Sequence, residues 1–98
     1  MPTFDRLALF KREYRKLTPN QKARFRVAVD KLVAALKQDP PSLPGDPLVH
    51  PLTGHHGVYE LRFAPDGRAT FTFGAPQRAS QPHIIRRRIG GHEVLERP

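Results

Sequence analysis

Ninety-eight residues, of which 38% are hydrophobic, provide enough chain for one small domain and exclude a large enzyme with a separate cofactor domain. Cysteine is absent, which excludes a disulfide scaffold and a zinc site made of thiolates. No apolar run approaches the roughly 20 residues of a membrane-spanning helix, and the first residues lack a signal-peptide core. We therefore expect a cytoplasmic protein with no membrane partner.

The charge is strongly basic and unevenly distributed. Lysine and arginine number 17 against nine acidic residues, which gives a net charge of +8. Residues 1–37 hold ten basic and three acidic side chains, whereas residues 38–98 hold seven and six. This balance favours a polyanionic partner, nucleic acid first, with the N-terminal part as its footprint. The alternative is a basic helical surface that maintains solubility or binds an acidic protein.

The N-terminal part predicts two helices. Large apolar residues at Leu7, Phe10, Tyr14 and Leu17 are spaced by three or four positions and predict a helix within residues 4–17. These residues form one stripe, which we expect to pack in the core. The charged residues between them are left on the solvent side.

A second helix begins with a capping signal. Thr18 supplies the cap hydroxyl, Pro19 suits the first helical position, and Gln21 is placed to bond back to the cap. Apolar residues then recur at helical spacing and predict a helix that ends near Lys37. They are Phe25, Ala28, Val29, Leu32, Val33 and Leu36. The short connection predicts that the two helices are antiparallel neighbours.

Five prolines between Gln38 and Pro51 predict a constrained loop. Its His50, together with His55 and His56, is either solvated or in contact with RNA. A zinc site made of these three imidazoles is disfavoured, because no thiol or carboxylate pattern supports it.

Alternating apolar and polar residues predict strands over 58–63 and 68–73, joined by a turn. Side-chain parity favours a three-residue loop with Gly67 in the left-handed conformation, which pairs Leu61 with Phe71 and Arg62 with Thr70. The pattern places five polar residues on one face of this hairpin, with the last at its mouth. They are Glu60, Arg62, Thr70, Thr72 and Arg68.

The C-terminal part predicts a connection over 74–81 and a strand over 83–89. Strict alternation along that strand sends Arg86 and Arg88 to one face and Arg87 to the other. Gly90 and Gly91 then end the strand.

The order of these parts resembles the RelE/ParE toxin superfamily, in particular the RelE-like and HigB-like toxins of type II toxin-antitoxin systems. The segments that carry the resemblance are Val49–Leu52, Gly57–Arg62, Arg68–Phe73 and Ile89–Leu95. We therefore expect a single α+β domain over residues 1–98, in which two N-terminal antiparallel helices pack on one face of a small antiparallel sheet.

The resemblance implies a messenger RNA endonuclease that acts in the ribosomal A site. In such toxins the 2′-hydroxyl of the RNA attacks the neighbouring phosphate, and neither a metal nor a cofactor takes part. This reaction needs a base, cations that stabilise the phosphorane and an acid for the leaving oxygen. The resemblance implies that Arg62 and Arg68 bind the phosphate and that Glu60 and His92 exchange protons, without assigning which is the base.

The same resemblance implies two partners. An antitoxin, expected to bind DNA, would cover the basic surface, and ribosomal RNA would bind the lysines and arginines. The cations expected at the RNA are Lys11, Arg12, Arg15, Lys22, Arg24, Arg26, Arg86 and Arg88. Two alternatives remain open, namely a non-catalytic inhibitor of DNA gyrase like the ParE branch and a plain RNA-binding module.

Overall fold

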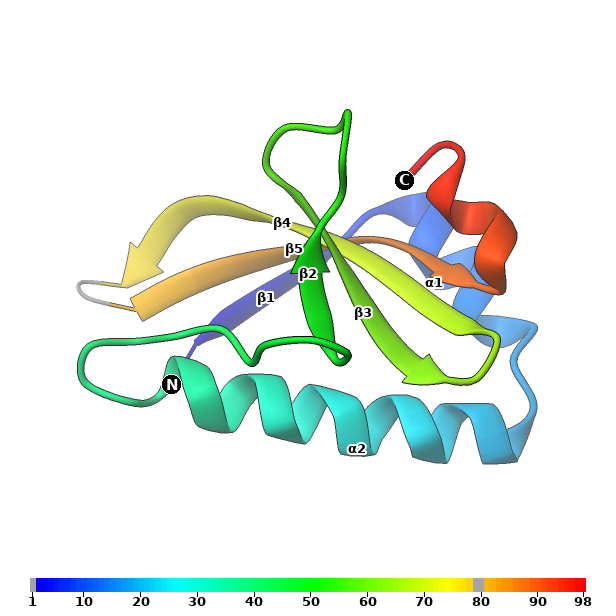
Figure 1. The fold of residues 1–98 in the computed structure, drawn as a ribbon, viewed down its shortest axis with the longest axis horizontal. Coiled ribbons are helices and arrows are strands. Elements are labelled where there is room, and N and C mark those ends of the chain that lie inside the picture. Colours follow the sequence, from blue (N-terminus) through cyan, green and yellow to red (C-terminus); the bar gives the residue numbers. More distant parts are fainter. Residues whose placement is uncertain (1, 79–80) are drawn as a thin grey trace.

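The computed structural model describes residues 2–78 and 81–98, in which two helices and a short 3-10 helix flank a five-stranded sheet (Figure 1). The strands follow the order β1-β5-β4-β3-β2, with β1 parallel to β5 and every other pair antiparallel. This arrangement confirms the predicted α+β class. In chain order the elements are β1 (Thr3–Arg6), α1 (Ala8–Arg15), α2 (Pro19–Leu36), β2 (Val49–Pro51), β3 (Val58–Ala64), β4 (Gly67–Arg78), β5 (Gln81–Gly90) and η1 (His92–Leu95).

The first predicted helix is shorter than its apolar stripe suggested. Residues Thr3–Arg6 form β1, which pairs with β5 from Thr3 opposite His83 onward. Leu7 then caps α1 and is 42% exposed, whereas Phe10 is 1% exposed. The prediction of a helix from residue 4 was wrong, because a partner strand 80 residues away supplies the hydrogen bonds that a helix would otherwise have supplied.

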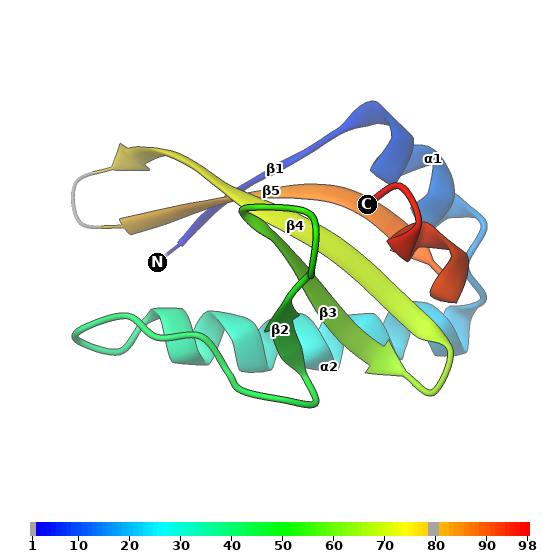
Figure 2. The same ribbon diagram turned by 45° about the horizontal axis from the view of Figure 1, so that its top comes forward.

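The second helix is confirmed. The backbone N–H of Gln21 donates to Oγ1 of Thr18 at 3.1 Å, and the N–H of Thr18 donates to Oε1 of Gln21 at 2.8 Å. This reciprocal cap satisfies two donors at the helix N-terminus. α2 ends at Leu36 and lies across one face of the sheet (Figure 2). The residues that it buries are Phe25, Ala28, Leu32 and Leu36.

The two helices meet through aromatic rings. Phe25 of α2 lies 6.0 Å, between ring centroids, from both Phe10 and Tyr14 of α1, and 5.5 Å from Phe63 of β3. The apolar core therefore lies between the helices and one face of the sheet. No helix within residues 2–78 and 81–98 is long and apolar enough to cross a membrane.

The proline-rich segment ends in a short strand that the sequence did not predict. β2 pairs antiparallel with β3, with Val49 opposite Leu61 and His50 opposite Glu60. The alternation over three residues is too short to distinguish it from a loop. Pro51 is tolerated because β2 forms the edge of the sheet.

The hairpin of β3 and β4 has a register different from the predicted one. Arg62 lies opposite Arg68, and Leu61 lies opposite Ala69 rather than Phe71. Ala64 pairs with Gly67, so the turn has two residues, and an irregularity at Phe63 restores the side-chain parity.

Gly67 is required at this turn for steric reasons. Its φ angle does not lie in the left-handed region, so that prediction was wrong. A Cβ atom on Gly67 would lie 2.6 Å from the ring of Phe63. The absence of a side chain lets the bulged strand fold its ring over the turn.

Strands β4 and β5 extend beyond their predicted ends. Of the predicted connection, residues 74–78 belong to β4 and Gln81 to β5, while residues 79 and 80 lie outside the described part of the chain.

The three consecutive arginines of β5 do not alternate as predicted. Phe71 lies opposite Arg86 and Thr70 opposite Arg88, so Arg87 is an extra residue in the ladder. Arg86 reaches the aromatic rings under the helices, and Arg88 reaches Glu13 and the C-terminal residues. This bulge therefore corrects the expectation that Arg86 and Arg88 share a face.

Candidate functional site

The face of the sheet opposite α2 carries the predicted polar residues. The observed register places them together, as predicted, because a shift by two residues preserves the face to which each side chain points. Glu60 lies at the centre, between His50 of β2 and Thr70 of β4. Three neighbouring strands thus contribute to one polar cluster.

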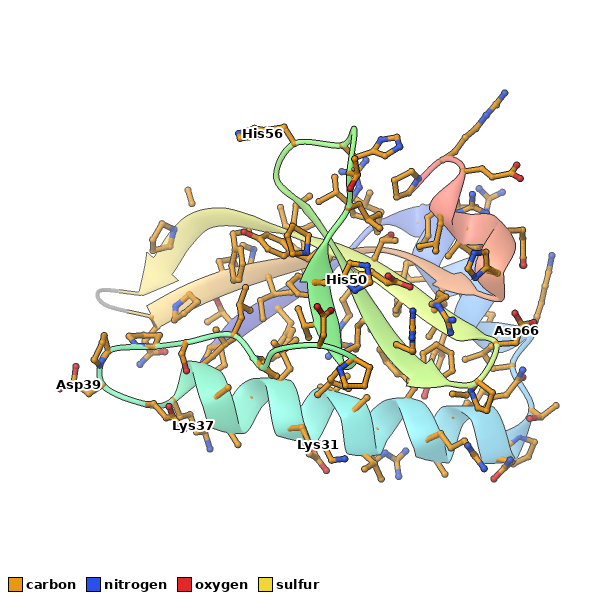
Figure 3. All side chains as sticks on the ribbon, in the orientation of Figure 1. Lys31, Lys37, Asp39, His50, His56 and Asp66 are labelled. Carbon is orange, nitrogen blue, oxygen red and sulfur yellow. The ribbon has the colours of Figure 1, made fainter. Side chains whose placement is uncertain are left out.

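A chain of ionic contacts runs through this cluster from solvent to the interior. Nδ1 of His50 lies 3.1 Å from Oδ1 of Asp46, and its Nε2 lies 2.6 Å from Oε2 of Glu60. Oε1 of Glu60 lies 2.7 Å from Nε of Arg68. The side chain of Asp46 is 76% exposed, that of His50 33% and that of Glu60 only 2%. His50 therefore connects a buried carboxylate with the open surface (Figure 3).

The side chain of Arg68 binds the backbone of the hairpin turn that precedes it. Its Nη1 donates to the carbonyl oxygens of Ala64, Pro65 and Gly67 at 3.0, 3.2 and 3.0 Å. The side chain is 7% exposed. The structure therefore gives Arg68 a part in holding the turn and in balancing the charge of Glu60, with little solvent contact.

Arg62 differs from Arg68 in being accessible. It lies opposite Arg68 and two residues from Glu60, so its side chain belongs to the same face. The residue is exposed, and within the described part of the chain its guanidinium has no hydrogen bond or ion pair. Thr70 presents a buried Oγ1 that has no hydrogen-bond partner among the described residues. The exposed guanidinium of Arg62 therefore lies on the same face as buried polar side chains, among them that of Thr70.

His92 lies at the end of the sheet near the hairpin turn. It begins η1, is exposed, and its backbone N–H donates to Oδ1 of Asp66 at 3.3 Å. Gly90, two residues earlier, pairs with Arg68. The structure therefore brings His92 to the same end of the sheet as Arg68, while Glu60 lies further in along β3.

Most of the predicted RNA-binding cations are on the helix surfaces. Lys22 is half-buried with its Nζ 5.3 Å from the ring centroid of Tyr14. The exposed ones are Lys11, Arg12, Arg15, Arg24 and Arg26.

The two arginines predicted from β5 have internal partners instead. Arg88 donates to both carboxylate oxygens of Glu13, at 3.2 and 2.6 Å, and these hydrogen bonds raise the pKa of Arg88. Arg86 is half-buried over Phe4 and Phe25, and burial lowers its pKa. Neither is freely presented to a nucleic acid.

The structure adds His50 to the candidate residues. In the sequence, His50 is one of three loop histidines expected to be either solvated or in contact with RNA. The signal in the sequence was weak, namely an apolar Val49 directly before it, consistent with one step of alternation. In residues 2–78 and 81–98, no three histidine, aspartate or glutamate side chains gather as metal ligands.

No protein-family model and no curated protein matches the sequence. The fold, however, is shared with solved toxins. RelE of the RelB-RelE antitoxin-toxin complex from Methanococcus jannaschii is 14% identical over 96% of this chain and 94% of its own, with a TM-score of 0.61. The structure of the Escherichia coli DinJ-YafQ complex matches at 16% identity, over 97% of this chain and 98% of its own, with a TM-score of 0.61.

The YoeB/ParE toxin from Agrobacterium tumefaciens is 15% identical over 92% of this chain and 98% of its own, with a TM-score of 0.62. Such matches cover almost the whole length of both chains. The predicted resemblance to the RelE-like toxins is therefore confirmed at the level of the fold.

Proposed function

We propose that this protein is the toxin of a toxin-antitoxin pair and that it cleaves messenger RNA in the ribosomal A site without a metal. The shared fold supports the toxin role, because solved structures with this fold include toxins bound to the antitoxins RelB and DinJ. The observation that carries the proposed cleavage is the 2.6 Å contact of His50 with Glu60 beside the exposed Arg62.

His50 is suited to act as the base. Both ring nitrogens face a carboxylate, and we assign the proton of the neutral imidazole to Nε2, because its contact with the buried Glu60 is the shorter, at 2.6 Å against 3.1 Å for Nδ1 and the exposed Asp46. Nδ1 then keeps a lone pair that can take the proton of a 2′-hydroxyl. Within residues 2–78 and 81–98, the polar contact of Nδ1 is with Asp46, whose side chain is 76% exposed and free to turn toward solvent. The buried Glu60 orients the ring and stabilises the imidazolium that forms.

The phosphate requires cations and an acid. Arg62 supplies an accessible guanidinium that can bind two phosphoryl oxygens at once. Arg68 lies opposite Arg62 on the neighbouring strand. Its positive charge adds to the potential at the phosphate, while its hydrogen bonds stabilise the turn. His92 is the remaining exposed imidazole at this end of the sheet, and we assign it the proton for the leaving 5′-oxygen. Glu60 as the base itself is disfavoured by its burial.

The proposed partners follow from the charge. The exposed cations of α1 and of the start of α2 would bind ribosomal RNA phosphates, and an acidic antitoxin segment would compete for the same surface.

Induced expression followed by primer extension on abundant messenger RNAs tests the proposal. We expect new 5′ ends within translated regions, and none when translation is blocked. Arg62→Ala and His50→Ala should each reduce cleavage about 100-fold, because each removes one catalytic group. Arg97→Ala, an exposed arginine outside the cluster, is the matched control and should leave cleavage unchanged.

Two other outcomes would contradict the proposal. Broken chromosomal DNA without new messenger RNA ends would indicate a gyrase inhibitor of the ParE kind. Retained RNA binding without cleavage or growth arrest would indicate a plain RNA-binding module. Circular dichroism of each variant separates loss of a catalytic group from loss of the fold.

A further inference from the structure

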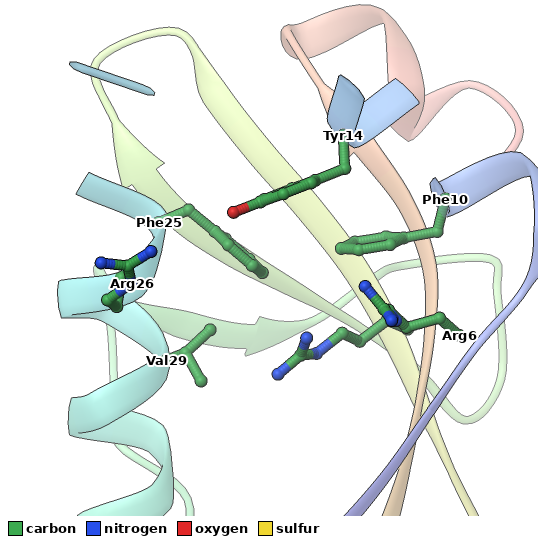
Figure 4. Close-up of a pocket in the computed structure, with 7 residues that line it drawn as sticks. Arg6, Phe10, Tyr14, Phe25, Arg26 and Val29 are labelled. Atoms are coloured by element: carbon green, nitrogen blue, oxygen red, sulfur yellow. The ribbon is translucent and has the colours of Figure 1, made fainter. Parts of the chain in front are cut away.

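A second group of basic residues surrounds a cavity on the helix side of the sheet, away from the His50-Glu60 cluster. The cavity measures about 190 Å³ and is partly open to solvent. Phe10 and Tyr14 of α1 and Phe25 of α2 provide aromatic walls (Figure 4). Three arginines line it as well, and they come from three different elements. They are Arg6 of β1, Arg26 of α2 and Arg86 of β5.

Arg86 is held without a counter-charge. Its guanidinium carbon lies 4.5 Å from the ring centroid of Phe4 and 5.7 Å from that of Phe25. Burial lowers the pKa of Arg86, and the neighbouring charge of Arg6 lowers it further. The bulge at Arg87 is what turns this side chain toward the helices. Among the described residues, aromatic side chains alone stabilise this half-buried cation, Tyr14 included, so a bound anion would offset part of the cost of its burial.

None of the three arginines has an ion pair with a carboxylate among the described residues. Glu13, the acidic residue of α1, forms its ion pair with Arg88. Asp5 of β1 lies 3.8 Å from His83, and Asp30, although four residues after Arg26, forms no ion pair within the described chain. The cavity therefore concentrates three positive charges beside apolar walls, where charges interact more strongly than in water.

We propose that this cavity binds the phosphate group of a small phosphate monoester. Guanidinium groups from three different elements line this cavity, and such a concentration of positive charge suits a dianion better than a singly charged carboxylate. The aromatic walls offer a surface on which an organic substituent can pack. This site is separate from the proposed nuclease site, because Arg86 reaches Phe25 on the helix side of the sheet whereas Glu60 is on the opposite face.

Binding of inorganic phosphate to the full chain provides the test. An NMR titration follows the side-chain Nε–H signals of the arginines, with sodium chloride at equal ionic strength as reference. We expect saturable shifts for Arg86 and Arg26 with phosphate and not with chloride. Arg26→Gln should weaken binding about tenfold, because it removes one charge-assisted contact from an exposed position. Lys31→Gln removes the same charge from α2 outside the cavity and should leave binding unchanged.

A second comparison identifies the source of the phosphate. Adenosine 5′-monophosphate should shift the Arg86 signal and adenosine should not. RNA oligomers with a 5′-phosphate or a 5′-hydroxyl should leave it equally unaffected. A response to the 5′-phosphorylated oligomer alone would assign the cavity to RNA ends and overturn the small-ligand proposal. Equal responses to phosphate and chloride, or tight binding retained in Arg86→Met and Arg26→Gln, would also overturn it.

Discussion

At the scale of single residues, burial separates groups that the sequence presents as equivalent. Glu60, Arg62 and Arg68 alternate on one face, yet of these three only Arg62 is exposed, while the side chains of Glu60 and Arg68 are 2% and 7% exposed. A carboxylate so deeply buried is tolerable only with partners, and Glu60 has His50 and Arg68. Its charge therefore has a structural function whatever reaction the site carries out.

Replacing Glu60 by glutamine should destabilise the protein. The variant leaves the buried Arg68 without a counter-charge, and we expect a loss of about 3 kcal/mol in the free energy of unfolding. Urea denaturation followed by circular dichroism measures it. Asp46→Asn removes the exposed end of the same ionic chain and should cost less than about 0.5 kcal/mol. Equal losses of unfolding free energy in the two variants would show that the contact of Glu60 with Arg68 does not stabilise the fold.

At the scale of elements, two bulges determine what each strand presents. The irregularity at Phe63 sets the pairing of β3 with β4, and so places Arg62 opposite Arg68. The bulge at Arg87 turns Arg86 toward the helices. Each bulge adds one residue to one strand. Residues on the two sides of the bulge that strict alternation would place on the same face of the sheet therefore lie on opposite faces. Both candidate sites depend on such a bulge.

The hairpin turn offers a direct test, because Gly67 is required by its contact with Phe63. Gly67→Ala would place a Cβ atom 2.6 Å from that buried ring, and we expect destabilisation by about 1–3 kcal/mol. Thermal unfolding measures it. Gly45→Ala is the matched control, since nothing lies within 4 Å of its Cβ position, and it should change stability by less than about 0.5 kcal/mol. A neutral Gly67→Ala would mean that the ring moves aside at little cost.

At the scale of the whole molecule, charge is segregated. Exposed cations with no unpaired acidic residue next to them in sequence are found in the last turns of α1 and the first turns of α2. Lys31 of α2 and Lys37 just after it instead have Asp30 and Asp39 near them in sequence. Figure 3 shows Lys31, Lys37 and Asp39. Nucleic acid that binds through phosphates should therefore prefer the first region.

The salt dependence of RNA binding measures this preference. Loss of two phosphate contacts in the double variant Arg12→Ala and Arg15→Ala should reduce the slope of log affinity against log salt by about 1.4. Fluorescence anisotropy with a single-stranded RNA provides the affinities. The double variant Lys31→Ala and Lys37→Ala loses the same charge and should change the slope much less. An equal change in both would indicate binding spread over the whole helix.

Features that depend on residues close together along the chain could be predicted before the fold was known. The capping box of Thr18 and Gln21, the buried stripe of α2 and the alternation within β3 and β4 are local patterns, and the structure has them all. Local alternation also identified the polar face of the hairpin, because an error of two residues in the register does not change faces.

The remaining features depend on how distant segments pack in the folded protein. β1 exists because β5 offers it hydrogen bonds from the far end of the chain, and His50 meets Glu60 because β2 pairs with β3 at the sheet edge. Arg86 is half-buried because the bulge at Arg87 turns it toward the helices. Each is a contact between segments distant in sequence, and its free energy depends on the packing of the assembled sheet and helices, which local residue patterns do not encode.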